Sequence, residues 1–216
     1  KSTYLVEKAD FVACHSPSYV TKYDMVQDLK DGGTFLLNSE WTPENIAEHL
    51  PGQVKRYMAE HNINFYMIDG IKIGREIGLG KRINTVLQSA FFKLANIIPT
   101  DEAIKYMKEK ALASYAKKGD DIVQMNYKAI DAGAEALVKV EIPEDWKNCP
   151  DEDFSKVATV GAQKVLDYVN NIQKKVNACK GDSLTVADFK DYADGEMPQG
   201  TAAYEKRGIA VDVPVW

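Results

Sequence analysis

Three short apolar runs, separated by segments with helix signals, constrain the fold of this 216-residue chain most strongly. The first helical segment is residues 16–29, with Ser16 or Ser18 as its N-cap, and the second is residues 42–50, which begin with Thr42 as N-cap. The runs typical of buried strands are ADFVACH (9–15), TFLLN (34–38) and INFYMID (63–69). Strands that alternate with helices in this way predict parallel βαβ units and an α/β fold.

The rest of the chain is typical of helices followed by a less regular tail. We expect helices over residues 86–98, 100–118, 120–138 and 155–179, a strand at KVEIP (139–143) and a loop over 144–154. After Gly181 the sequence is punctuated by Gly and Pro, as in an extended linker. The whole pattern predicts a three-layer Rossmann-like α/β domain with a mostly parallel sheet and an extended C-terminal arm.

Composition excludes several classes of function. The net charge of −5 does not fit a nucleic-acid interface, and no apolar run approaches the roughly 20 residues that span a bilayer. The three cysteines are far apart and form no CxxC, so neither a zinc ribbon nor an iron–sulfur cluster is encoded here. Sparse cysteines suit a reducing compartment, so we expect a cytoplasmic protein. From the net charge and the short apolar runs we expect no nucleic-acid partner and no membrane partner.

The glycine-rich stretch GREIGLGKRIN (74–84) almost matches a phosphate-binding loop. Gly80 and Lys81 have the spacing of a Walker A motif from Gly74, but Arg82 stands where Ser or Thr would bind magnesium. The dinucleotide fingerprint fails as well, because Ile83 replaces its third glycine. We therefore favour a structural turn from the third strand into the helix over 86–98. A nucleotide-binding loop remains an alternative.

Other candidate site residues have equally simple structural explanations. His15 and Ser16 follow the first strand at its carboxyl end, where α/β folds place ligands. Lys117 and Lys118 occupy the last turn of a helix, where a Lys pair either complements the helix dipole or binds an anion. Cys14 falls within an apolar strand, so we expect it to be buried and unreactive.

Several long phrases resemble a known family. The segments are YLVEKADFVACHSPSYVTKYDMVQDLKDGGTFLLNSEW, NINFYMIDGIKIGREIGLGKRINTVLQSAFFKLANIIP and MNYKAIDAGAEALVKVEIP. They are similar to the gamma-type domain of pyruvate:ferredoxin (flavodoxin) oxidoreductases, and DGEMPQGTAAYEKRGIAVDVPVW resembles the EKR segment that follows it. The resemblance implies a gamma-type domain over 1–180 and an EKR-type arm over 181–216. It also implies an internal fragment, since the family's domain begins earlier with glycine-rich phrases.

The resemblance carries expectations about function. The family's whole enzyme converts pyruvate and coenzyme A into acetyl-CoA and carbon dioxide, and passes electrons through iron–sulfur clusters to ferredoxin or flavodoxin. Thiamine diphosphate, magnesium and the clusters belong to other domains, and the full enzyme is expected to be a homodimer. This part would be a non-catalytic scaffold that helps bind coenzyme A through Ser16, Lys117 and Lys118. Ser16 departs from the Asn that the family pattern has at that place.

Three alternatives stay open from the sequence. The chain could be a free-standing gamma subunit of another 2-oxoacid oxidoreductase, although the EKR tail is typical of fused enzymes. It could be a nucleotide-binding domain that uses residues 74–81. It could also be a purely structural module between domains.

Overall fold

The computed structural model describes residues 6–152 and 157–205 of the chain. It divides into two compact units: a first unit of Lys1–Val20 with Asp24–Glu152, and a second of Thr21–Tyr23 with Asp153–Trp216. Along the sequence, the main boundary between the units falls after Glu152, earlier than the expected family border at 180. The border at 180 separates the gamma-type domain from the EKR-type arm, which is a division by sequence family and not by compactness, so it stays a prediction.

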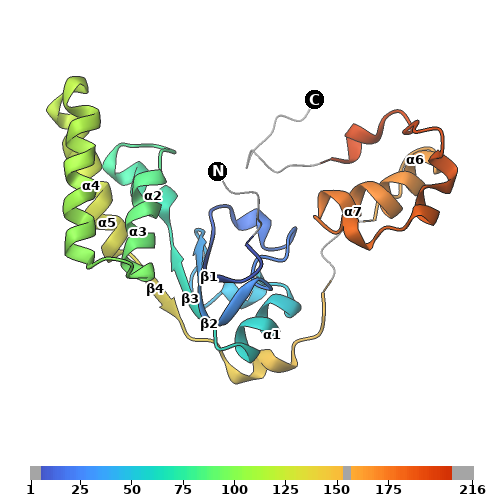
Figure 1. The fold of residues 1–216 in the computed structure, drawn as a ribbon, viewed down its shortest axis with the longest axis horizontal. Helices are drawn as coiled ribbons and strands as arrows, with labels where there is room; N and C mark the ends of the chain where they lie inside the picture. The colour runs from blue at the N-terminus through green and yellow to red at the C-terminus, as the bar shows by residue number, and fades with distance from the viewer. Residues whose placement is uncertain (1–5, 153–156, 206–216) are drawn as a thin grey trace. The chain divides into compact units, whose positions relative to one another are not determined.

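A four-stranded sheet forms the centre of the first unit (Figure 1). Its strands follow chain order: β1 (Ala9–Cys14), β2 (Leu29–Asn38), β3 (Asn64–Ile68) and β4 (Val138–Val140). The first three are parallel, and β4 runs antiparallel to β3. The expected α/β class with a mostly parallel sheet is therefore confirmed. A strand is present near KVEIP as β4, but it begins at Val138 and ends at Val140, short of the expected end at residue 143.

Both faces of the sheet are covered by helices, which gives three layers. Phe35 of β2 and Phe65 of β3 stack with ring centroids 5.5 Å apart on one face, where α1 (Gly52–Glu60) packs. Leu36 and Ile68 point to the other face, against α3 (Asn84–Ala95) and α5 (Asp120–Glu135). Neighbouring strand residues face opposite sides, so a sheet covered on both faces needs continuous apolar runs.

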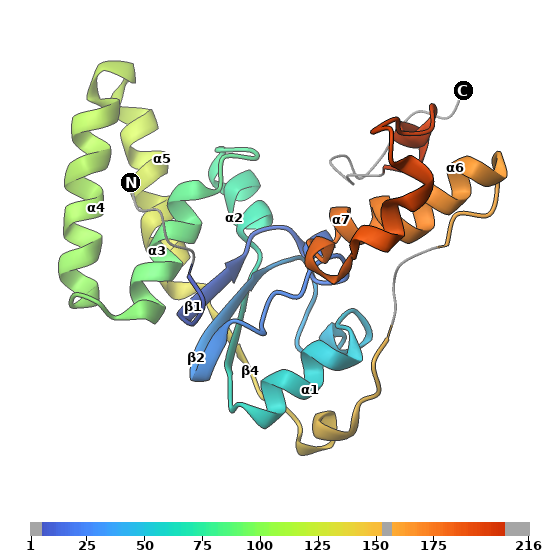
Figure 2. The ribbon, with the colours of Figure 1, turned by 45° about the vertical axis from the view of Figure 1, so that its right-hand side comes forward.

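The helices on the second face pack unusually closely. Gly133 of α5 lies against α3, where a Cβ atom would be 2.2 Å from the Val86 carbonyl oxygen. Ser89 of α3 donates a hydrogen bond of 2.5 Å to the Ile130 carbonyl oxygen of α5. Outside these two helices, α4 (Thr100–Tyr115) forms an antiparallel hairpin with α5 (Figures 1 and 2).

Two expected helices are absent from the described residues. Residues 16–28 contain a 3-10 helix, Pro17–Tyr19, and otherwise an irregular chain from which Val20 and Val26 are buried, and Leu29 already begins β2. The DGG sequence does not end a helix, since it lies inside β2.

The second expected helix, over residues 42–50, is reduced to a 3-10 helix, Ile46–Glu48. The Asn45 side chain accepts a hydrogen bond of 2.9 Å from the Thr42 backbone and closes a tight turn. The helix of this crossover is α1, which begins after Pro51.

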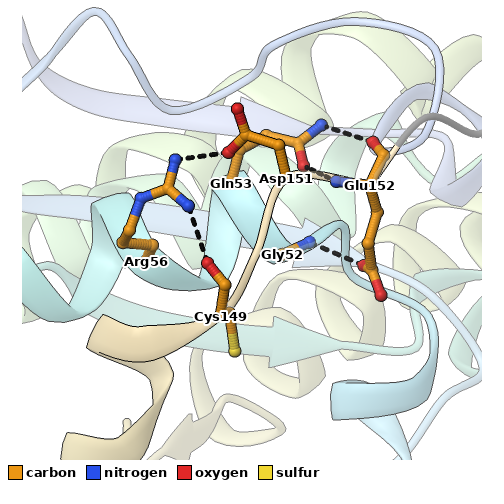
Figure 3. A network of polar contacts seen from close by, with 6 residues as sticks. All are labelled: Gly52, Gln53, Arg56, Cys149, Asp151 and Glu152. Atoms are coloured by element: carbon orange, nitrogen blue, oxygen red, sulfur yellow. Dashed lines mark hydrogen bonds and ion pairs between the residues drawn. The ribbon is translucent and has the colours of Figure 1, made fainter.

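The start of α1 is capped from a distant part of the chain (Figure 3). No side chain at Pro51 caps this helix, but the Gly52 N–H donates a hydrogen bond of 2.7 Å to the Glu152 carboxylate. Gln53 forms two more bonds with the Glu152 backbone, each 3.0 Å long. Glu152 thus supplies the acceptor that an N-cap side chain normally provides.

Arg56 completes this clasp, which we define as residues 149–152 bound to α1. Its guanidinium donates to the Cys149 carbonyl oxygen at 2.6 Å and forms an ion pair with Asp151 (Figure 3). Residues 149–152 can approach α1 this closely only because its first residue is glycine. A Cβ at Gly52 would lie 1.8 Å from the Pro150 carbonyl oxygen.

Glu152→Ala is expected to destabilise the first unit by about 1 kcal/mol, because α1 loses its only side-chain cap among the described residues. The free energy of unfolding from urea titration measures the effect. Glu152→Gln is the matched control: its amide oxygen still accepts from Gly52, so it should retain most of the stability. Equal losses in both variants would contradict the capping role.

Within residues 157–205, the second unit contains one interrupted helix and several short 3-10 turns. Residues 163–177 are helical as α6 (Gln163–Tyr168), a π-helical turn and α7 (Lys174–Asn177), which confirms the central part of the helix expected over 155–179. The segment after it runs through 3-10 helices at 181–183, 186–192 and 201–204. The end of the EKR-like segment, residues 206–216, lies outside the described residues. None of the helices described in 6–152 and 157–205 is long and apolar enough to cross a membrane.

Candidate functional site

The carboxyl ends of the three parallel strands are joined by one buried amide. Asn38 ends β2 and is 1% exposed. Its Nδ2 donates a hydrogen bond of 3.0 Å to the His15 carbonyl oxygen after β1, and its Oδ1 accepts one of 2.9 Å from the Gly70 N–H after β3. A Cβ at Gly70 would lie 3.0 Å from that Oδ1, so glycine permits the close approach. Asn38 therefore fixes the edge of the sheet where α/β folds place ligands.

Asn38→Ala is expected to cost about 2 kcal/mol of stability, because it leaves the Gly70 N–H buried without a partner and removes the donor to the half-buried His15 carbonyl oxygen. The neighbouring Ser39 provides the control. It is 5% exposed, and its hydroxyl has no hydrogen-bond partner within residues 6–152 and 157–205. Ser39→Ala should therefore leave the melting temperature nearly unchanged. Similar destabilisation by the two variants would show that the amide does not act through its two bonds.

Ser16 lies at this edge, just after β1. Its hydroxyl is 3.0 Å from the Ser18 hydroxyl, and it precedes the 3-10 helix Pro17–Tyr19. Cys14 is buried beside it, as the sequence predicts, and its Sγ is 3.1 Å from the Ser16 carbonyl oxygen. Burial raises the pKa of the Cys14 thiol to about 11, so the group stays protonated and a poor nucleophile near neutral pH.

Lys117 and Lys118 lie elsewhere in the first unit. They form the 3-10 turn that closes the α4–α5 hairpin, and both are exposed. The Lys118 Nζ lies 5.4 Å from the centroid of the Tyr115 ring. The hairpin projects this turn away from the strands (Figures 1 and 2), so the structure does not bring the lysines together with Ser16.

The glycine-rich stretch forms a corner between two helices. β3 leads directly into α2 (Gly70–Ile77), which contains Gly74 in its interior. Gly78 and Gly80 then adopt left-handed backbone conformations, with φ of 93° and 61°, and turn the chain toward α3. The prediction that this stretch turns the chain directly from the third strand into the helix over 86–98 is wrong. The helix α2 follows β3, and the turn comes after α2. Gly74 and Lys81 do not share one loop, which argues against a Walker-type site.

A pocket of about 620 Å³ lies beside this corner, between β1 and α3. Its floor is apolar and includes Phe11, Leu87 and Phe91, whereas His15, Lys81 and Arg82 bring polar and cationic groups to it. We call it the β1–α3 pocket. The start of α3 has no side-chain cap, so its first N–H groups add to the positive potential. The pocket is suited to an organic anion with an apolar part.

The sequence contained one signal for this pocket, the Lys81–Arg82 pair directly before a helix. Lys81 and Arg82 share the pocket with His15 and Phe11 only because β1 lies beside α3. No local sequence pattern indicates that arrangement. In the part of the chain that the structure describes, no group of three His, Cys, Asp or Glu side chains could hold a metal ion.

Comparison with known proteins identifies related sequences along the whole chain. The family model described as pyruvate ferredoxin/flavodoxin oxidoreductase matches residues 1–136, and a model named EKR, described as a domain of unknown function, matches residues 156–210. A solved structure of pyruvate oxidoreductase subunit PORC from Thermotoga maritima has a TM-score of 0.49 and 17% identity, over 63% of this chain and 67% of that chain.

Several curated relatives match all of this chain, among them the following three. Pyruvate:ferredoxin oxidoreductase of Moorella thermoacetica is 47% identical, and pyruvate-flavodoxin oxidoreductase of Enterobacter agglomerans is 44% identical. Pyruvate dehydrogenase (NADP+) of Cryptosporidium parvum is 41% identical. The chain spans only 18%, 18% and 12% of these three relatives. Because the first family model matches more than half of the chain, the chain belongs to the pyruvate ferredoxin/flavodoxin oxidoreductase family.

Proposed function

We propose that this chain is one segment of an enzyme that oxidises pyruvate with coenzyme A to acetyl-CoA and carbon dioxide. The observation that carries the proposal is the match of all 216 residues to an enzyme named pyruvate:ferredoxin oxidoreductase at 47% identity. The segment is a scaffold and a ligand-holding part. Thiamine diphosphate, magnesium and iron–sulfur clusters belong to other parts of the enzyme, which are also its partners.

The names of the relatives suggest which step this segment serves. They differ in the electron acceptor, which is ferredoxin, flavodoxin or NADP+, but all three name pyruvate. A segment that is shared across different acceptors fits a role in the reaction common to them. We therefore assign it to the steps that involve pyruvate and coenzyme A, and we assign the choice of acceptor to other parts of the enzyme.

Within this function, Ser16, Lys117 and Lys118 are proposed to help bind coenzyme A. Both lysines are exposed, and flexible ammonium groups suit the phosphates of the coenzyme. Since Ser16 lies on a different element, it would contact another part of the same ligand or a neighbouring segment. The gamma subunit of a different 2-oxoacid oxidoreductase is the alternative for the whole chain.

The test is steady-state kinetics of the full-length enzyme that carries this chain, with reduction of an artificial dye as the readout. Turnover should require both pyruvate and coenzyme A. Turnover with another 2-oxoacid in place of pyruvate would favour the alternative, and activity independent of coenzyme A would overturn the proposal.

A double variant addresses the lysines. Lys117→Met with Lys118→Met should raise the KM for coenzyme A about tenfold and leave the KM for pyruvate unchanged, because charge-assisted contacts to phosphate are lost. The exposed Lys105 and Lys128, changed together to Met, form the charge-matched control. An unchanged KM for coenzyme A would exclude the lysine pair.

A further inference from the structure

The second unit has a very small apolar core. Within residues 157–205, the buried apolar side chains are Leu166, Val169 and Ile172, all from the helical segment that runs from α6 to α7. A core of this size rarely keeps so short a segment folded by itself. Other apolar side chains of the same segment are exposed: Val157, Val160, Val176, Val186, Phe189 and Met197. The second unit therefore has apolar surface that further protein can cover.

One lysine of this unit has its charged group inside the protein. Lys174 is the first residue of α7, and its Nζ is shielded from solvent without a hydrogen-bond partner in residues 6–152 and 157–205. The ion pairs of these residues do not include it either. Removal of an ammonium group from water is strongly unfavourable unless an opposite charge is paired with it. Lys174 therefore calls for an anionic partner.

The residue before Lys174 offers a hydrogen-bond acceptor in a fixed orientation. The Nε2 of Gln173 donates a hydrogen bond of 3.2 Å to the Thr201 carbonyl oxygen. Because a carbonyl can only accept, this bond determines which end of the amide is the nitrogen. The Oε1 at the other end is buried and has no partner among the described residues. Two consecutive residues thus present a cation and an acceptor, both shielded from water.

A π-helical turn, Val169–Gln173, leads directly into this pair. Such a turn adds one residue to a helix, and it occurs frequently at functional sites. The turn is held firmly, because Asn170 accepts from the Ala158 N–H at 2.8 Å and donates to the Ala158 carbonyl oxygen at 2.9 Å. The positions of Gln173 and Lys174 are therefore set by a well-anchored backbone.

The chemistry of the pair limits what can meet it. A water molecule could donate to the Gln173 Oε1, but it would not neutralise the Lys174 ammonium. A small free anion needs a cavity, and the cavity of about 740 Å³ in this unit is lined by residues 162–165 and 195–199, without Gln173 or Lys174. A carboxylate on a protein segment supplies the charge, and the backbone of that segment supplies an N–H group.

Nearby carboxylates of the second unit already have partners. Asp188 accepts from the backbone and the hydroxyl of Thr185, and Asp167 accepts from the Gln163 amide at 2.7 Å. An acidic residue from elsewhere is therefore the better partner. The chain spans 18% of its relative from Moorella thermoacetica, so an enzyme of that length has many other residues that could supply it.

We propose that the second unit is a receptor for an acidic segment from another part of the full-length enzyme. An Asp or Glu side chain of that segment forms a buried ion pair with Lys174, and one of its N–H groups donates to the Gln173 Oε1. The segment also covers exposed apolar side chains of the unit. This goes beyond the proposed function, because it gives a docking role to the part of the chain whose family model is described as a domain of unknown function.

The sign of one mutational effect tests the ion pair. In the full-length enzyme, Lys174→Met would leave the incoming carboxylate buried and unpaired, so the second unit should open more often. Limited digestion with chymotrypsin reports this opening through cleavage after Phe189, which should become at least about tenfold faster. If Lys174 had no anionic partner, removal of its charge would instead stabilise the unit. Slower or unchanged cleavage would therefore overturn the proposal.

The neighbouring lysine provides the matched control. Lys175 is exposed, and Lys175→Met removes the same charge and the same side-chain length one position away. This variant should be cleaved at the wild-type rate. Equal acceleration in both variants would show a general effect of charge on the helix, and it would contradict a specific partner for Lys174.

A second experiment does not depend on how the variants fold. A carbodiimide joins an ammonium group to a carboxylate only where the two are in contact, and peptide mapping of the cross-linked wild-type enzyme identifies both residues. We expect Lys174 to be linked to an Asp or Glu outside residues 1–216. A link to a carboxylate within residues 1–216 would overturn the external segment, and the absence of any link to Lys174 would overturn the ion pair.

Discussion

Gly133→Ala is expected to destabilise the first unit by about 2 kcal/mol or more, although alanine is normally the better helix former. The new Cβ would lie 2.2 Å from the Val86 carbonyl oxygen and 3.0 Å from the Cβ of Ser89, so α3 and α5 would have to move apart. That movement would also stretch the bond from Ser89 to Ile130. Chemical denaturation monitored by far-UV circular dichroism measures the loss.

The control for this variant lies on the same helix. Glu135 is exposed in the last turn of α5, so Glu135→Ala should change the stability by no more than about 0.5 kcal/mol. If Gly133→Ala were neutral or stabilising, the close contact between the two helices would be wrong.

Phe65→Ala is expected to have the largest effect, a loss of about 3–5 kcal/mol. Phe65 is fully buried on the α1 face of the sheet and stacks on Phe35. Its removal leaves a cavity between β3 and α1 that the paired strands on both sides cannot close. The urea midpoint should fall steeply, and the variant should accumulate poorly in cells.

Two further substitutions make this prediction specific. Phe65→Leu retains much of the apolar volume and should lose clearly less stability than the alanine variant. Lys139→Ala, on the neighbouring strand at an exposed position, should be nearly neutral. Equal stability of the alanine and leucine variants would mean that the position is not tightly packed.

The sheet could be predicted from the sequence because its strands carry their own signal. Runs such as TFLLN are apolar on both alternating faces, which only a strand covered on both sides requires. The helices α3, α4 and α5 could be predicted as well, since each has a long apolar stripe or a clear C-terminal sequence.

The helices α1 and α2 could not be predicted, for a physical reason. Each begins with a glycine, Gly52 and Gly70, and α2 contains Gly74 in addition. Glycine lowers helix propensity by about 1 kcal/mol, so local patterns favour turns at these places. The glycines are needed because other segments pass too closely for a Cβ, which is a property of the packed chain.

In the candidate site, too, local positions could be predicted from the sequence, whereas the arrangement of the residues in space could not. A sequence pattern placed Ser16 at the end of a strand and Lys117 at the end of a helix, and both positions are as expected. The separation between them depends on the length and direction of the α4–α5 hairpin. Asn38, which joins the ends of the parallel strands, gave no signal, because a buried amide has no characteristic spacing.

The clasp on α1 also affects the order in which the chain can fold during synthesis. Gly52 and Glu152 are separated by 100 residues, so the ribosome needs about 5–20 s to make the chain between them. During that interval α1 and the strand β3 can form, but the helix start lacks its acceptor. The nascent chain therefore exposes an incomplete sheet face for seconds, which is long enough for a chaperone to bind. Completion of the first unit waits for the last residues before its boundary.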